Sequence, residues 1–415
     1  MNMRGNVLPV DLKKPESFAV TSSASRFTLY WFWAVFGFIF AYAPAVIPTA
    51  AFAQDVKVLR IATGPIDTTE FPFGGLVGNA ISNPPGSREC DRGGNCGVPG
   101  LIANTQSSEG TWNNLKALLR GDVDLALSQA DIVNWSFYGI GDFEGKETFT
   151  RLRVLARLYP STIHLIARPG TKITSVKDLV GKRVAVDGEG TGTRFTVKAI
   201  LAAYGVLSTS VSLRVMNITT VATALKDGKI DAMFVVSGAP ILALQDLSRT
   251  VPFTLIPISG PTAEKLTHAF PFYTLGVIPA DTYGAHPDIA TMDVGTVLIA
   301  RDDFDSDLGF GIARAIWHER NTVLFESGHP RGKLMDKKLA ARSLGVPIQD
   351  GAARYYISKK LMEPPPRIAP AEPSRPLAPQ PAPRPAAPKP LPAPLTLPPA
   401  LPATVSATST GATQR

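Results

Sequence analysis

The sequence contains few of the residues that build metal sites and redox centres. Its 415 residues include only two cysteines, Cys90 and Cys96, and five histidines. No histidine lies near the cysteines, and none of the histidines falls in a G-x-S-x-G or H-E-x-x-H motif. His164 lies inside an apolar strand and is predicted to be a core residue. We therefore predict no catalytic residues, no metal, no cofactor and no enzymatic activity.

A dense basic surface is also missing. The net charge is +8, of which residues 1–53 contribute +2 and residues 363–415 contribute +3, so the 309 residues between them carry only +3. A nucleic-acid-binding protein normally concentrates lysine, arginine and aromatic residues on one face. The nearly balanced middle of the chain predicts that nucleic acid is not a partner.

An apolar run near the N-terminus predicts export. Residues 27–47 are apolar, basic residues precede them, and Ala51-Phe52-Ala53 follows with the small residues of a cleavage site. We predict a signal peptide over residues 1–53, cleaved after Ala53. The alternative is an uncleaved anchor, because 21 apolar residues can span a bilayer. Both alternatives place residue 54 onward outside the cytoplasm, and we predict a periplasmic protein.

Proline dominates the other end of the chain. Residues 364–402 contain 17 prolines, a composition that forms neither helix nor sheet and buries little surface. We predict that residues 363–415 form a disordered tail. An extended stalk that contacts the cell wall is the alternative.

The two cysteines predict a local disulfide. Outside the cytoplasm thiols can pair, and Cys90 and Cys96 are separated by a flexible Gly93-Gly94 turn. The bridge would close a short loop and contribute on the order of 2 kcal/mol to stability.

The middle of the chain alternates β-branched runs with amphipathic stretches, which is typical of α/β proteins with mostly parallel sheets. One pattern occurs twice. A helix over 112–120, Gly121 and a strand that begins at Asp124 correspond to a helix over 221–227, Gly228 and a strand that begins near Asp231. This repetition suggests two lobes built on one plan.

A strand over 183–186, the loop GEGTGT (188–193) and a helix that begins near Arg194 form a possible anion site. Free N–H groups and the helix dipole both point at such a loop. Incidental glycines in a packed turn are the alternative. A dinucleotide site is disfavoured because Thr193 replaces the last glycine of G-x-G-x-x-G. Residues 163–168 and 294–303 are predicted to cross between the lobes.

Several segments of the chain, taken in order, resemble the TAXI family of extracytoplasmic solute receptors, which serve TRAP transporters. The similarity runs through nearly all of residues 56–357. The segments that carry it are IATG and TTEFPFGG (within 61–75), 104–131, 155–170, 176–194, 224–240, 270–283 and 351–356.

The resemblance implies a two-lobed type II periplasmic-binding-protein fold with a hinge and an interlobe ligand cleft. Residues 54–166 and 293–362 would form lobe 1, and residues 167–292 would form lobe 2. The implied function is to capture a small carboxylate-bearing solute, such as a glutamate- or glutamine-like amino acid or an organic acid, and to deliver it to TRAP membrane subunits. The alternative is a sensor that partners a membrane receptor kinase.

The family pattern makes Arg194 the leading candidate for binding the solute carboxylate, since a guanidinium can hold a carboxylate with two hydrogen bonds. Glu70 and Glu109 depart from that pattern and favour a ligand with an ammonium group. Turn formation, helix capping and core packing are the alternatives for the other candidates. The predicted ligand-binding residues are Thr63, Gly64, Thr69, Glu70, Phe71, Ser107, Ser108, Thr111, Gln129, Asp131, Tyr159, Gly190, Thr191, Gly192, Thr193, Arg194, Ser237 and Gly238.

Overall fold

The computed structural model of the protein describes residues 56–342 and 344–364. The predicted signal peptide and nearly all of the predicted tail lie outside these residues. The described residues up to Met362 belong to one compact unit. Within the described ranges, no helix combines the length and the apolar character needed to cross a membrane.

The strands alternate with helices along the chain. The earlier strands are β1 (Lys57–Ala62), β2 (Ser82–Asn83), β3 (Val98–Pro99), β4 (Leu101–Gln106), β5 (Leu125–Gln129) and β6 (Leu152–Ala167). The later ones are β7 (Arg183–Val186), β8 (Ser212–Val215), β9 (Ala232–Ser237), β10 (Thr254–Leu255), β11 (Tyr273–Ile278) and β12 (Ile289–Arg301). They form one mixed sheet in the order β3-β2-β4-β1-β5-β12-β6-β9-β7-β8, with β10 on β6 and β11 on β12.

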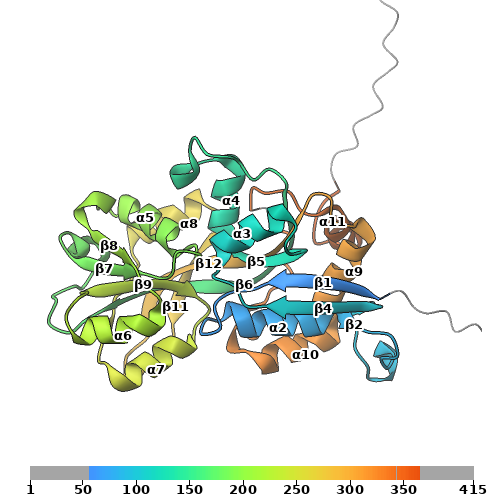
Figure 1. The fold of residues 1–415 in the computed structure, drawn as a ribbon, viewed down its shortest axis with the longest axis horizontal. Helices are drawn as coiled ribbons and strands as arrows, with labels where there is room; N and C mark the ends of the chain where they lie inside the picture. Colours follow the sequence, from blue (N-terminus) through green and yellow to red (C-terminus); the bar gives the residue numbers. More distant parts are fainter. Residues whose placement is uncertain (1–55, 343, 365–415) are drawn as a thin grey trace, which may run out of the picture. The chain divides into compact units, whose positions relative to one another are not determined.

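Helices cover both faces of this sheet (Figure 1). The α-helices are α2 (Glu70–Ile81), α3 (Thr111–Arg120), α4 (Ala130–Tyr138), α5 (Thr193–Ala203), α6 (Ile218–Lys226), α7 (Leu242–Thr250), α8 (Pro261–Ala269), α9 (Ser306–Ile316), α10 (Glu319–Gly328) and α11 (Asp350–Ser358). Short 3-10 turns are η1 (Cys90–Arg92), η2 (Gly141–Phe143), η3 (Val176–Leu179), η4 (Ser208–Ser210) and η5 (Pro330–Leu334). Helices α3, α4, α5 and α8 lie on one side, and α2, α6, α7 and α10 lie on the other.

Two long antiparallel strands, β6 and β12, join the two halves of the sheet (Figure 1). Strand β12 pairs with β5 in the half that we call lobe 1, and β6 pairs with β9 in the half that we call lobe 2. The other pairs at the centre of each lobe, β4–β1–β5 and β8–β7–β9, are parallel. This architecture confirms the predicted α/β fold class, and β6 and β12 are the predicted crossing strands. Hinge motion about them stays a prediction.

The repeated sequence pattern corresponds to a repeated ion pair. In lobe 1, Asp124 accepts hydrogen bonds from the backbone amide of Arg60 at 2.8 Å and from its guanidinium at 3.2 Å. In lobe 2, Asp231 accepts the same two kinds of bond from Arg183, at 3.0 Å from the amide and 2.6 Å from Nη2. Each aspartate thereby fastens its strand to the neighbouring parallel strand. The two lobes share this plan, as the sequence suggested.

Three clusters of buried apolar side chains form the core. One lies in lobe 1 between the sheet and helices α2, α9, α10 and α11, and another lies in lobe 2 beneath α6 and α7. The third extends over both lobes on the opposite face and contains side chains of α3, α4, α5 and α8. The lobes therefore share an apolar layer on one side of the sheet.

The sequence pattern predicts a helix that starts at Leu76, a helix capped by Thr111, a strand over 124–131 that runs into a loop, and one closing helix over 306–325. The structure differs at each of these four places. Helix α2 begins at Glu70, six residues before the helix start expected at Leu76. The Thr111 hydroxyl does not cap α3; instead it accepts a hydrogen bond from the amide of Gln129 at 3.1 Å. Strand β5 leads directly into α4 and not into a loop. The expected closing helix is divided at Trp317 and His318 into α9 and α10.

The predicted disulfide between Cys90 and Cys96 is present, and it closes the loop that contains η1. Cys96 is buried and Cys90 is half-buried. The bridge connects residues six positions apart, so it restrains only one short loop of lobe 1.

We expect the double substitution Cys90→Ser and Cys96→Ser to lower the free energy of unfolding by about 2 kcal/mol, because a short closed loop removes little entropy from the unfolded chain. Urea titration of the oxidised wild type and the variant measures this difference. Free thiols detected in exported, non-reduced wild-type protein would contradict the disulfide itself.

Candidate functional site

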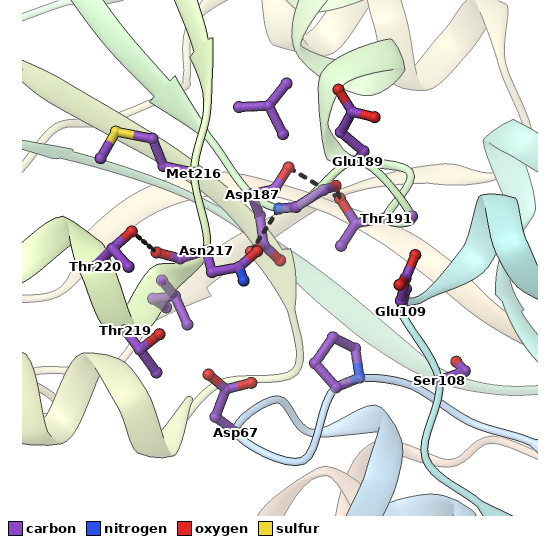
Figure 2. Close-up of a pocket in the computed structure, with 15 residues that line it drawn as sticks. Asp67, Ser108, Glu109, Asp187, Glu189, Thr191, Met216, Asn217, Thr219 and Thr220 are labelled. Carbon is purple, nitrogen blue, oxygen red and sulfur yellow. Dashed lines mark hydrogen bonds between the residues drawn. The ribbon is translucent and has the colours of Figure 1, made fainter.

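A cavity of about 720 Å³ lies where loops from both lobes meet (Figure 2). It is found beyond the carboxyl ends of β1, β4, β7 and β8. Ligands of open α/β sheets bind at this edge, because the loops there carry free backbone groups and variable side chains. The lining consists of Pro65 and Asp67 after β1, Ser108 and Glu109 after β4, residues 187–191 after β7, and residues 215–220 from the end of β8 into α6.

The cavity is acidic. Asp67, Glu109, Asp187 and Glu189 supply four carboxyl groups, and none of the fifteen described lining residues is a lysine, arginine or histidine. Glu109 and Glu189 are exposed, Asp67 is half-buried, and Asp187 is buried. The negative potential is therefore greatest on the wall formed by the end of β7, where water screens charge least.

Asp187 follows directly after β7 and has only 5% of its surface exposed. The amide of the adjacent Gly188 donates a hydrogen bond to Oδ1 at 2.9 Å. Among the described residues, no ion pair includes Asp187. Burial, together with the negative charges of Asp67 and Glu70, raises the pKa of Asp187 to about 6. A positive group in the cavity would relieve this unfavourable burial.

The glycine-rich loop contacts lobe 1 directly. The Gly190 carbonyl accepts hydrogen bonds from the amides of Trp112 at 2.8 Å and Asn113 at 3.2 Å, and so it caps the N-terminus of α3. A Cβ atom at Gly190 would lie 2.3 Å from Cβ of Glu109. Only glycine permits this approach, so the loop is shaped for contact between the lobes as well as for the cavity wall.

Arg194 lies outside the cavity lining. Its guanidinium carbon lies 4.6 Å from the ring centroid of Phe195, and its Nε is buried with no hydrogen-bond partner in the described part of the chain. The neighbouring Thr193 hydroxyl is also buried without a partner there. The assignment of Arg194 to a solute carboxylate stays a prediction that the cavity does not support.

Glu70 binds lobe 2 instead of lining the cavity. Its carboxylate accepts hydrogen bonds from Ser237 Oγ at 2.7 Å and from Ser161 Oγ at 3.2 Å. Ser237 Oγ in turn accepts a hydrogen bond from the amide of Thr69 at 3.0 Å, and the Thr69 hydroxyl donates to the Gly238 carbonyl. Burial raises the pKa of Glu70. Four predicted site residues thus form a polar contact between the lobes.

Asp131 is fully buried at a second contact. Its carboxylate accepts hydrogen bonds from Thr196 Oγ1 at 2.6 Å and Tyr273 Oη at 3.0 Å, which connects α4 to α5 and β11. The amide of Ile132 also donates to it, as expected for an acidic residue in the first turn of a helix. Burial raises the pKa of Asp131 to about 6. These hydrogen bonds to the Asp131 carboxylate all come from groups of the protein itself, so Asp131 connects the lobes.

The remaining predicted residues divide between the cavity and its supporting structure. Ser108, Gly190 and Thr191 line the cavity. The others lie outside its lining. Thr63 donates to the Gln106 carbonyl, and the Gly64 carbonyl accepts from the Ser108 amide. Phe71 is half-buried in α2, and Ser107 lines a smaller cavity.

The last four of these residues lie in packed contacts. The Thr111 hydroxyl accepts a hydrogen bond from the Gln129 amide, and Gly192 packs on the Gln129 side chain. The Tyr159 ring packs on the ring of Phe73.

The structure adds residues that the sequence reasoning missed. Asp67, Asp187 and Asn217 line the cavity. The position of Asp187 directly after a buried strand is a signal that the strand-end rule for α/β sheets could have used. Arg331 is also new: it is 4% exposed, and its Nε donates to the Ala239 carbonyl at 2.7 Å and its Nη2 to Thr162 Oγ1 at 2.5 Å.

The histidines and cysteines do not gather at the cavity. His164 is fully buried between the Tyr283 hydroxyl and the Thr162 carbonyl, each at 3.0 Å, and burial lowers its pKa to about 3. It is the core residue that was predicted. Among the described residues, the one set of three possible metal ligands within 4.8 Å of one another is Cys90, Cys96 and His318, and its cysteines form the disulfide.

Several solved structures of binding proteins are similar to this chain. An ancestral arginine-binding protein bound to arginine is 14% identical, with a TM-score of 0.40, over 65% of this chain and 97% of that one. The alkanesulfonate-binding protein from Xanthomonas axonopodis pv. citri, bound to MOPS, is 12% identical, with a TM-score of 0.39, over 75% and 96%. The periplasmic aliphatic sulphonate-binding protein from Escherichia coli is 13% identical, with a TM-score of 0.36, over 66% and 78%.

A protein family matches much more of the sequence than any single motif does. Residues 61–359 match the NMT1-like family. This match begins within β1 and ends just after α11, so it includes both lobes, both crossing strands and all four segments that line the cavity. The chain therefore belongs to the NMT1-like family.

Proposed function

We propose that this protein is an extracytoplasmic solute receptor, which captures a small solute between its lobes and delivers it to the membrane subunits of a TRAP-type transporter. The transporter class rests on the resemblance to TAXI receptors. The periplasmic location rests on the apolar N-terminal run and on the paired cysteines, since disulfides persist outside the cytoplasm.

The observation that carries this proposal is the cavity lined by loops from both lobes. Its volume of about 720 Å³ is in the range that holds small organic ligands. Its walls come from two bodies joined by β6 and β12, so a bound solute would touch both lobes at once. A ligand that contacts both lobes stabilises their approach, which is the form that a membrane partner would recognise.

The lining suggests how a solute would be oriented. Ile218 and Thr219 are the first two residues of α6 and line the cavity, and their amides have no acceptor among the described residues. They could hold a carboxylate, as helix N-termini do. An ammonium group would lie toward Asp187. We propose this cavity, and not the surroundings of Arg194, as the place where an amino-acid-like solute binds.

Filling the cavity should abolish capture. We expect Thr219→Trp, which places a large ring among the lining residues, to weaken binding of any solute found in a thermal-shift panel of amino acids, amines and organic acids by about 100-fold or more. Titration calorimetry measures the loss. The matched control is Thr209→Trp, an exposed position on η4 outside the lining, which should bind like the wild type.

Two outcomes would contradict the proposed function. One is a panel in which no small solute raises the melting temperature of the folded protein. The other is a Thr219→Trp variant that binds the solute as well as Thr209→Trp does, because the solute would then bind outside this cavity.

A further inference from the structure

The four carboxyl groups of the cavity come from three separate segments of the chain. Asp67 lies after β1, Glu109 after β4, and Asp187 and Glu189 on either side of Gly188 (Figure 2). Nothing basic among the described lining residues balances them. Like charges held around one space repel each other, and this repulsion favours binding of an opposite charge.

Asp187 differs from an ordinary surface acid, because it is buried and hardly exposed to water. It is 95% buried and lines the cavity, and among the described residues its carboxylate accepts one hydrogen bond, from the Gly188 amide. Buried carboxylates normally have a basic partner or several donors. The missing partner of Asp187 is most simply a positive group that enters the cavity.

The arrangement of the carboxyl groups fits an organic cation better than a metal ion. Within the described residues, no three of these acids bring their oxygens within 4.8 Å of one another. Calcium and magnesium need several oxygens at about 2.0–2.6 Å from one centre. Separated carboxylates around a cavity of about 720 Å³ instead suit positive groups that lie apart on one flexible chain.

Resting on the proposed function, we propose that the cavity selects a small organic cation with two or more ammonium or guanidinium groups: a diamine, a polyamine or a basic amino acid. One positive group pairs with Asp187 on the buried wall. The second meets Asp67 or the two glutamates at the opening. An amino-acid carboxylate, where the ligand has one, lies at the start of α6.

Binding of defined probes to the full-length protein tests this specificity. We expect putrescine, spermidine and L-arginine to raise the melting temperature at pH 7.5 and physiological salt. Glutamate, 2-oxoglutarate, glutamine and calcium ions should leave it unchanged. Titration calorimetry then gives the dissociation constant of the best cation.

Substitutions identify the groups involved. Asp187→Asn keeps the hydrogen bond to Gly188 and removes the charge, so the best cation should bind about 30-fold more weakly or worse. Asp67→Asn should weaken it about tenfold. The matched control is Asp91→Asn on η1, an exposed acid outside the cavity, which should change the dissociation constant less than twofold.

The affinity for the cation should also decrease as the pH is lowered. The other acids that line the cavity are Asp67, Glu109 and Glu189, and the charge of Glu70 also acts on Asp187. Protonation of Asp187 removes charge that attracts the cation. Because the pKa of Asp187 is raised to about 6, we expect binding to be about tenfold weaker at pH 5 than at pH 7.5. In the Asp187→Asn variant most of this dependence should disappear.

The results separate this inference from the function on which it rests. If glutamate or 2-oxoglutarate binds, the cations do not, and Thr219→Trp blocks the acid, the receptor function holds and the cation specificity is wrong. If calcium binds in place of the organic cations, the specificity is also wrong. If nothing in the panel binds, both proposals are wrong.

Discussion

Replacement of Arg331 with methionine is expected to lower the free energy of unfolding by about 3 kcal/mol. Arg331 is 96% buried, and its guanidinium donates to the Ala239 carbonyl and to Thr162 Oγ1. Thr162 in turn donates to the buried Asp293 at 2.7 Å. Burial raises the pKa of Asp293, while the positive charge of Arg331 lowers it. Methionine fills similar space but leaves the Ala239 carbonyl and Thr162 Oγ1 without this donor. It also removes one of the positive charges that act on the Asp293 carboxylate.

A double-mutant cycle with Asp293→Asn measures this coupling in urea. If the two groups act together, Asp293→Asn should cost less in the Arg331→Met background than in the wild type, by about 1 kcal/mol or more. The control is Arg314→Met, an exposed arginine on α9, which should change stability by less than about 0.5 kcal/mol. A loss for Arg331→Met no larger than that of the control would contradict the assignment.

Truncation of Phe195 should both destabilise the protein and loosen the contact between its lobes. Phe195 is 4% exposed on α5, and its ring centroid lies 4.8 Å from that of Phe143 and 5.9 Å from that of Trp112 on α3. Phe195→Ala removes a buried ring from a layer shared by both lobes, and the expected loss of stability is about 3–5 kcal/mol. The radius of gyration from small-angle scattering should increase.

The matched control is Phe325→Ala. Phe325 is 1% exposed, belongs to the lobe 1 core, and stacks on Phe73 with centroids 5.6 Å apart. Its loss should destabilise the protein by a similar amount without changing the lobe separation of the remaining folded molecules. Equal scattering curves for the two variants would mean that the aromatic contact does not hold the lobes together.

The sequence predicted features that depend on short stretches of chain. The helix-Gly-strand pattern at Gly121 and Gly228 is local, because each glycine adopts the positive φ that ends its helix, at 80° and 64°. The strands, the helix at Arg194 and the disulfide follow from similarly local chemistry. The matching aspartates, Asp124 and Asp231, were visible in the sequence, although their arginine partners were not.

The cavity could not be predicted in the same way, because it depends on how distant loops meet. Nothing in the sequence around Glu70 indicates that its carboxylate accepts a hydrogen bond from Ser237, which lies 167 positions later. Arg194 fits a family pattern, but packing places its guanidinium on Phe195. Arg331 lies in a short turn with no periodicity. Such positions are decided by tertiary contacts, on which hydrophobic periodicity carries no information.

The order of strands in the sheet also has a consequence for how the chain is made. Strand β5 pairs with β12, whose residues 296–299 are synthesised long after it, whereas the parallel strands of lobe 2 lie within residues 183–237. Contacts between distant residues form slowly, since a long loop must close first. We expect lobe 2 to acquire its native contacts before lobe 1. Until β12 has been synthesised, β5 keeps an open edge that can pair with other chains.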